Sequence, residues 1–239
     1  MDSVSLSADD RAALDGLGSD LRRVFGARLH SIAAYGLQAP ATSRRLLHTL
    51  ALVDRLSFDD LAACVPFVAG WRRQSVAIPL VLELEEFLRT LDVFPLEYGD
   101  IIAHHVIVAG ADPFTGARVS PADVRRACEL SAKSHLIHLR EGFLETGGDP
   151  QAVARLIGAS AASFSTLLRN IARLADDHEA DAAVTAERQI GIPAQVVRDV
   201  ISAGAGTHST IAEPTALLSR YIAASERVWE YVDTWRART

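Results

Sequence analysis

The sequence predicts an α+β protein in two parts, a small mixed β-sheet with helices in residues 1–115 and an all-helical bundle in residues 116–239. Two observations support this prediction. Strand-like apolar runs alternate with helical patterns up to about residue 112, whereas no strand pattern follows residue 120. The composition is that of an ordinary globular protein, with 49% hydrophobic and 23% charged residues in 239. We therefore expect most of the chain to be folded.

The first part opens with a helix and two strands. Ser7 is a suitable N-cap, and apolar residues recur at helical spacing from Leu14 onward. Within this helix we interpret Gly18-Ser19-Asp20 as a local irregularity. Apolar runs predict strands over 29–35 and 46–53, on either side of a loop that contains Pro40.

Further elements are expected between residues 57 and 108. Ser57, with Asp60 three residues later, resembles a capping box and predicts a helix to about Trp71. We then expect a third strand over 76–82, an acidic helix over 83–91, a fourth strand over 93–98 and a short apolar stretch over 106–108.

The second part reads as helices only. Ser120-Pro121 combines an N-cap with proline at the first helical position and predicts a long helix to about Glu145. Gly147 and Gly148 end it, and Asp149-Pro150 begin the next helix. The helices expected after this point are 150–157, 160–176, 181–190, 193–203 and 214–238.

The composition also excludes several functional classes. The net charge of −6 argues against general nucleic-acid binding. Two cysteines, Cys64 and Cys128, are too few for a disulfide framework, and we expect buried thiols. We expect no membrane span, because no run of about 18 apolar residues exists, and no signal peptide in Met1 to Asp10. A cytoplasmic protein is the default expectation, and the arginine bias (Lys133 is the only lysine) suggests a bacterial source.

The order of elements resembles the nucleotidyltransferases of the polymerase-β type. In that family a strand ends in Gly-Ser, a second strand carries Asp-x-Asp, a third carboxylate lies on a later strand, and a helical domain can follow. Here the run over 29–35 ends at Gly36, and the run over 46–53 follows a loop. The segment from Asp92 to Ile101 is similar to the later carboxylate-bearing strand, and Glu97 matches its carboxylate.

The serine and the two aspartates that characterise the resembled family have other residues in their places here. Leu37 stands where the family has serine, and Leu46 and His48 stand where it has two metal-binding aspartates. Nucleotidyl transfer needs metal ions held by hard oxygen ligands. We therefore expect no metal site and assign no catalytic residue, keeping Glu97 as the candidate. The expected ligand-pocket residues are Tyr35, Gly36, Leu37, Arg44, Arg45, His48 and Glu97.

These replacements lead to a main hypothesis and two alternatives. The main hypothesis is a nucleotidyltransferase-like protein that has lost catalysis and binds a nucleotide or a protein partner. One alternative is an active nucleotidyl- or adenylyltransferase that uses ATP or another nucleotide with magnesium, with Asp54, Glu97 and Asp100 as its carboxylates. The other is a structural or regulatory protein that forms homo-oligomers.

Four further motifs have both a functional and a structural interpretation. We interpret His135, His138 and Glu141 as a polar helix face rather than a zinc site, and His104-His105 as a structural pair. The spacing of Arg173 and His178 resembles that of HEPN-type ribonucleases, but Arg23 and His30 share it, as chance predicts. The rings of Trp229, Tyr231 and Trp235 are expected mainly in the core, although part of that surface could join two subunits.

Overall fold

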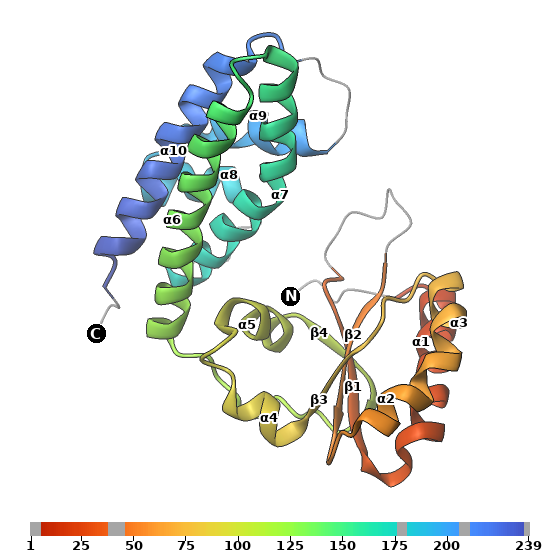
Figure 1. Ribbon diagram of the computed structural model, residues 1–239. Helices are drawn as coiled ribbons and strands as arrows, with labels where there is room; N and C mark the ends of the chain where they lie inside the picture. The colour runs from red at the N-terminus through yellow and green to blue at the C-terminus, as the bar shows by residue number, and fades with distance from the viewer. Residues whose placement is uncertain (1–5, 38–45, 176–180, 206–210, 237–239) are drawn as a thin grey trace. The chain divides into compact units, whose positions relative to one another are not determined.

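The computed structural model describes residues 6–37, 46–175, 181–205 and 211–236 (Figure 1). The chain divides into two compact units, Met1–Val119 and Ser120–Thr239. None of the helices in the described residues is long and apolar enough to cross a membrane.

A four-stranded mixed sheet forms the centre of the first unit. The strand order is β3-β2-β1-β4, in which β1 pairs antiparallel with both β2 and β4, and β2 pairs parallel with β3. The two edges of the described sheet are therefore formed by β3 and β4, the last two of its four strands in sequence. The strands are β1 Leu29–Tyr35, β2 His48–Val53, β3 Leu80–Glu83 and β4 His105–Gly110.

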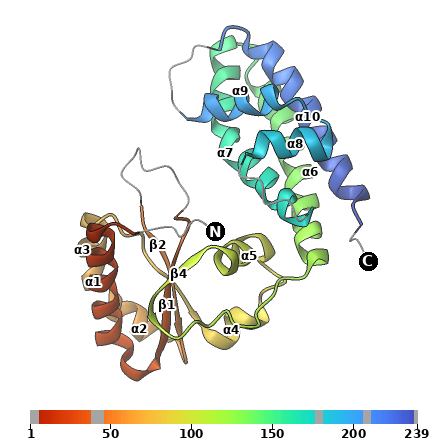
Figure 2. The ribbon, with the colours of Figure 1, turned by 180° about the vertical axis from the view of Figure 1, so that it is seen from behind.

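Helices cover the two faces of this sheet, as both ribbon views show (Figures 1 and 2). One face, here called the α1 face, is covered by α1, α2 and α3, and the other, called the α5 face, by α4 and α5. The elements are α1 Ala8–Phe25, η1 Gly26–Arg28, α2 Phe58–Cys64, η2 Val65–Phe67, α3 Val68–Arg73, α4 Leu84–Arg89 and α5 Pro95–Ala103.

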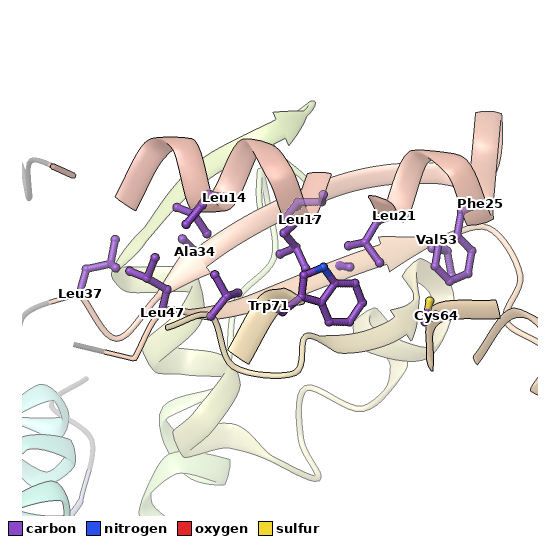
Figure 3. Packing of buried hydrophobic residues seen from close by; sticks show 14 residues of the cluster. Leu14, Leu17, Leu21, Phe25, Ala34, Leu37, Leu47, Val53, Cys64 and Trp71 are labelled. Atoms are coloured by element: carbon purple, nitrogen blue, oxygen red, sulfur yellow. The ribbon is translucent and has the colours of Figure 1, made fainter. Parts of the chain in front are cut away.

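The larger core of the unit lies on the α1 face. The capping box predicted at Ser7 is present, and the apolar stripe of α1 packs against Ile32 and Ala34 of β1. Figure 3 shows this stripe pointing toward the sheet and Trp71 lying beneath it. The indole of Trp71 donates to Asp20 over 3.1 Å, so the predicted irregularity at residues 18–20 is an ordinary part of the helix interface.

The helix predicted after Ser57 forms with its capping box, but a 3-10 turn divides it into two α-helical parts. The chain is α-helical in α2, forms the 3-10 turn η2 at Pro66, and is α-helical again in α3. Proline has no N–H to donate, which interrupts the hydrogen-bond ladder at that point. The α3 helix ends in a Schellman motif, because Ser75 donates to the Arg72 carbonyl and Val76 to the Trp71 carbonyl.

The strand predicted over 93–98 is wrong, because residues 95–103 form the helix α5. Pro95 occupies its first turn, and Tyr98 and Ile101 are buried against Phe87 and the α5 face of the sheet. The fourth strand is β4, in the apolar stretch that follows. The third strand is also shorter than predicted, because it begins at Leu80, directly after Pro79.

The second unit consists of helices throughout its described residues. The caps predicted at Ser120 and Asp149 both form, with each side chain accepting from a backbone N–H three residues later. Helices α6 and α10 pack on α7, which also packs on α9. The helices are α6 Pro121–Glu145, α7 Pro150–Leu174, α8 Ala182–Ile190, α9 Ala194–Gly204 and α10 Pro214–Thr234.

Two predictions about the second unit are corrected by its packing. The helices expected over 150–157 and 160–176 are the single helix α7, in which Gly158 lies close to α9. A β-carbon at Gly158 would lie 3.1 Å from the Ala203 carbonyl oxygen, so the glycine permits close packing of two helices instead of ending one.

The aromatic rings of Trp229, Tyr231 and Trp235, which were expected mainly in the core, are half-buried. Lys133 Nζ lies 3.6 Å from the centre of the Trp229 ring.

A substitution at Gly110 tests the contact between β4 and β1. Gly110 has a φ of +82°, and an added β-carbon would lie 2.0 Å from the His30 carbonyl oxygen. We expect Gly110→Ala to lower the free energy of unfolding by at least about 2 kcal/mol, measured by chemical denaturation. Gly116→Ala is the control, because Gly116 has a φ of +83° but open space around it, and it should cost only about 1 kcal/mol. Equal costs would contradict the close approach.

Ser75 offers a stabilising substitution at the end of α3. It has a φ of +59° and occupies the Schellman position that glycine usually fills. Ser75→Gly should raise the free energy of unfolding by about 0.5–1 kcal/mol, because glycine adopts this conformation without strain. Ser75→Ala keeps the β-carbon and should give no such gain in the same denaturation experiment.

Candidate functional site

Three strands bring polar side chains together at the end of the sheet where β1 ends. Tyr35, the last residue of β1, lies opposite His48 on one side and His105 on the other. The rings of Tyr35 and His48 are 5.8 Å apart between centroids and tilted by 36°. Burial raises the pKa of Tyr35, so its phenol stays protonated at neutral pH.

The alternation of side chains along β2 determines which residues lie on the same face of the sheet as Tyr35. Leu47 is buried on the α1 face, so Leu46 and His48 lie on the α5 face, where Tyr35 also packs. Leu46 is 50% exposed and His48 is exposed as well. Leu80 of β3 joins them, because it pairs with Leu50 of the same face and is 38% exposed. We call the group of Tyr35, Leu46, His48 and Leu80 the sheet-end surface.

The other predicted pocket residues do not all belong to this surface. Leu37 is 4% exposed and packs in the core of the α1 face, on the other side of the sheet. Gly36 is exposed, with a φ of +67° that carries the chain away from β1. Arg44 and Arg45 lie outside the described residues.

Glu97 lies on a helix and not on the strand that was predicted to carry it. It occupies the first turn of α5 and is exposed, whereas Tyr98 and Ile101 of the same helix point toward the sheet. The C-terminal end of α5, not its first turn, leads directly into β4 at His105. Glu97 therefore belongs to the helix that precedes β4 and not to a strand of the sheet that holds His48.

The carboxylates weighed for an active enzyme have other partners. Asp54 follows the last residue of β2, at the opposite end of that strand from His48, and contacts His30. Asp100 contacts His104 over 3.1 Å, one turn along the outer side of α5. Asp54 and Asp100 thus each contact a nearby histidine, Asp54 after the end of β2 and Asp100 within α5.

A magnesium ion, which the family resemblance would imply, does not fit the residues of this surface. Its positions 46 and 48 supply a leucine, which has no donor, and a histidine, whereas magnesium prefers carboxylate and other oxygen ligands. Within the described part of the chain, no group of three or more His, Cys, Asp or Glu is arranged to hold a metal ion.

The pair His104-His105 joins α5 to the strand and loop that follow. His105 Nδ1 donates to the carbonyl oxygens of Ile101 and Ile102, over 3.1 Å each, at the end of α5. Its ring packs against Phe114 at a centroid distance of 4.4 Å, and Asp112 lies 3.8 Å from its Nε2. These contacts give His105 a structural role beneath the sheet-end surface.

In the second unit, His135 lies in an aromatic cluster and not on a polar helix face. Its Nε2 is 2.7 Å from the Tyr221 hydroxyl, and its ring stacks on Phe164 at 5.6 Å. Burial and, to a smaller extent, the nearby His138 together lower the pKa of His135 to about 4. His135 therefore lies among aromatic rings, whereas His138 is exposed.

The remaining sequence candidates are the pair Arg173 and His178 and the two cysteines. Arg173 donates to Asn170, and His178 lies outside the described residues. Cys64 and Cys128 are both buried free thiols, as expected. Burial raises the pKa of Cys128 to about 12 and raises that of Cys64 as well, so neither thiol is reactive at neutral pH.

Sequence analysis missed the aliphatic side chains around His48. Leu80 reaches the sheet-end surface through its parallel pairing with Leu50, and Ile78, two residues earlier, is 55% exposed. Their signal in the sequence is an apolar run, which usually indicates a buried strand. Only the position of β3 at the edge of the described sheet shows that part of this run is exposed.

Comparisons with known proteins support the fold. No protein-family model matches the sequence, and no curated protein is similar to it. Among solved structures, the chain is similar to the spectinomycin adenyltransferase AAD(9) from Enterococcus faecialis, determined with ATP and spectinomycin. The TM-score is 0.54 at 8% identity, over 91% of this chain and 98% of that chain.

The chain has a nucleotidyltransferase-like fold. The similarity extends over nearly all of both proteins and so includes the mixed sheet and the helices that follow it. At 8% identity this similarity supports the fold and carries no residue roles across to this chain.

His135 makes the stability of the second unit dependent on pH. Its pKa is about 4 in the folded chain and about 6.5 in an unfolded one, so the unfolded state binds the additional proton between these values. We expect the contribution of His135 to the free energy of unfolding to be fully present above about pH 6.5. The free energy of unfolding should then fall by about 2–3 kcal/mol as the pH drops to 4.

The measurement is chemical denaturation from pH 7 to pH 4, followed by circular dichroism. In His135→Gln the contribution of this residue should disappear, which flattens the profile. The exposed His138 is the matched control, and His138→Gln should keep most of the pH dependence. Identical profiles for His135→Gln and the parent chain would contradict the assignment.

Proposed function

We propose that this chain is a nucleotidyltransferase-like protein that binds a nucleotide at the sheet-end surface without catalysing transfer. The observation that carries the proposal is the exposure of Leu46, two residues before β2, and of His48, its first residue. These are the two positions where the resemblance places metal-binding aspartates. The fold supports nucleotide binding, since the similar adenyltransferase was determined with ATP.

The chemistry of the surface suits a base better than a metal-bound triphosphate. Tyr35 and His48 offer two neighbouring rings, and Leu46 and Leu80 add exposed aliphatic area beside them. Bases stack on aromatic side chains with roughly 1–3 kcal/mol each. The phosphates would be held by Arg44 and Arg45, which directly precede Leu46 in the sequence.

The absence of carboxylates at positions 46 and 48 separates binding from catalysis. Transfer of a nucleotidyl group requires metal ions that neutralise the triphosphate and orient the leaving group. Leu46 and His48 cannot hold magnesium in this way, and Glu97, on the outer side of α5, does not compensate. A nucleotide bound here would therefore be a ligand and not a substrate.

A thermal-shift titration tests this proposal. Nucleoside triphosphates are added to the full chain, with and without magnesium or manganese. A ligand with a Kd of about 10 μM, present at about 1 mM, should stabilise the folded state by about 2.7 kcal/mol, which is a shift of several degrees. We expect a shift that does not depend on the metal and that is lost in His48→Ala. His138→Ala, an exposed histidine of the second unit, is the control.

Two other results would contradict the proposal in different ways. A metal-dependent shift, together with label transfer from ATP that Glu97→Gln abolishes, would show an active transferase. No shift with any nucleotide would favour a protein partner at this surface. The variant Leu46→Asp with His48→Asp removes the His48 ring and restores two carboxylates at exposed positions. We expect it to lose the metal-independent shift, as His48→Ala does, so that any shift with a nucleotide requires magnesium or manganese.

A further inference from the structure

The outer side of α2, η2 and α3 exposes a row of apolar side chains. Phe58 is 80% exposed, Val65 66% and Leu61 44%, and smaller apolar residues lie between and beyond them. The spacing follows successive helical turns. The α2 stripe, as we call it, consists of Phe58, Leu61, Ala62, Val65, Pro66 and Ala69.

This stripe is additional to the face that holds the segment on the sheet. Cys64, Phe67 and Trp71 form the inner side and pack in the core of the α1 face. A helix on the surface of a globular unit needs one apolar face, and its opposite face is usually polar. Here Asp59 is the only charged exposed residue between 58 and 69. A contiguous apolar patch of this kind is typical of an interaction site.

We propose that the α2 stripe pairs with the same stripe of a second copy of this chain, antiparallel and about a twofold axis. The largest side chain of the stripe, Phe58, lies at one end and the small Ala69 at the other. Antiparallel pairing places Phe58 opposite the partner subunit's Ala69, and Ala62 opposite the partner subunit's Val65. Each large side chain then meets a small one, which is the self-complementarity that a twofold interface requires.

The charges at the ends of the stripe favour the same arrangement. Asp59 lies at the Phe58 end and Arg72 one turn beyond Ala69, both exposed. Neither makes an ion pair within the described residues. Antiparallel pairing brings each Asp59 near the partner subunit's Arg72, whereas parallel pairing would bring like charges together.

The area of the stripe predicts a weak dimer. A fully exposed phenylalanine presents roughly 200 Å², and two stripes with their flanking residues would bury on the order of 1,000 Å² in total. This lies at the lower end of the range for specific interfaces. The monomer and dimer should therefore exchange, with a balance that depends on protein concentration.

Sedimentation velocity of the full chain over a range of concentrations tests the proposal. We expect a concentration-dependent dimer and a loss of affinity of about 100-fold or more in Phe58→Asp, which places two buried charges in the interface. Leu144→Asp is the matched control, because Leu144 is 78% exposed but lies on α6, outside the α2 stripe. The dimerisation affinity of this variant should equal that of the parent chain. Circular dichroism verifies that both variants are folded.

A charge exchange tests the antiparallel register. Asp59→Arg alone and Arg72→Asp alone should each weaken the dimer by about 3- to 10-fold, whereas the double variant should restore the parent affinity. A chain that stays monomeric at all concentrations overturns the proposal, as does a dimer that Leu144→Asp disrupts and Phe58→Asp does not. A double variant as weak as the single ones overturns the antiparallel arrangement.

Discussion

The pairing of β1 with strands on both of its sides is the constraint on which the first unit depends. From Ser31 to Ala34 the strand is buried on both faces, so alternate residues contribute to two separate cores. Its neighbours come from distant segments, with β2 on one side and β4 on the other. This pairing places Tyr35 between His48 and His105, and the backbone contact at Gly110 holds the other end of β4 against β1.

The composition of the sheet-end surface follows from this geometry. Tyr35 packs on the α5 face and Leu37 on the α1 face, because β1 ends at Tyr35 and the turn at Gly36, with a φ of +67°, interrupts the alternation of side chains. Only Tyr35 therefore shares a face with His48. Leu46 and His48 are exposed, so their identity affects the fold little. A fold shared with an adenyltransferase at 8% identity is therefore compatible with different chemistry at these positions.

The second unit depends on close helix packing and on one satisfied polar cluster. Gly158 and Gly204 let α7 and α9 approach closely, since a β-carbon on either would meet the other helix. His135, Tyr221 and Phe164 join α6, α10 and α7 through a hydrogen bond and ring contacts. His135 contacts Tyr221 within this cluster, whereas His138 is exposed, so the two rings have separate environments.

The sequence by itself determined the class of the fold and most helix starts, because capping at Ser7, Ser57, Ser120 and Asp149 involves residues only three positions apart. The replacement of the resembled family's aspartates by Leu46 and His48 stays a prediction from the sequence. The tertiary structure alone decided that residues 95–103 form a helix, since short apolar runs are ambiguous until their burial is known. It likewise decided that Leu37 leaves the candidate site and Leu80 enters it, because the pairing of distant strands determines which side chains share a surface.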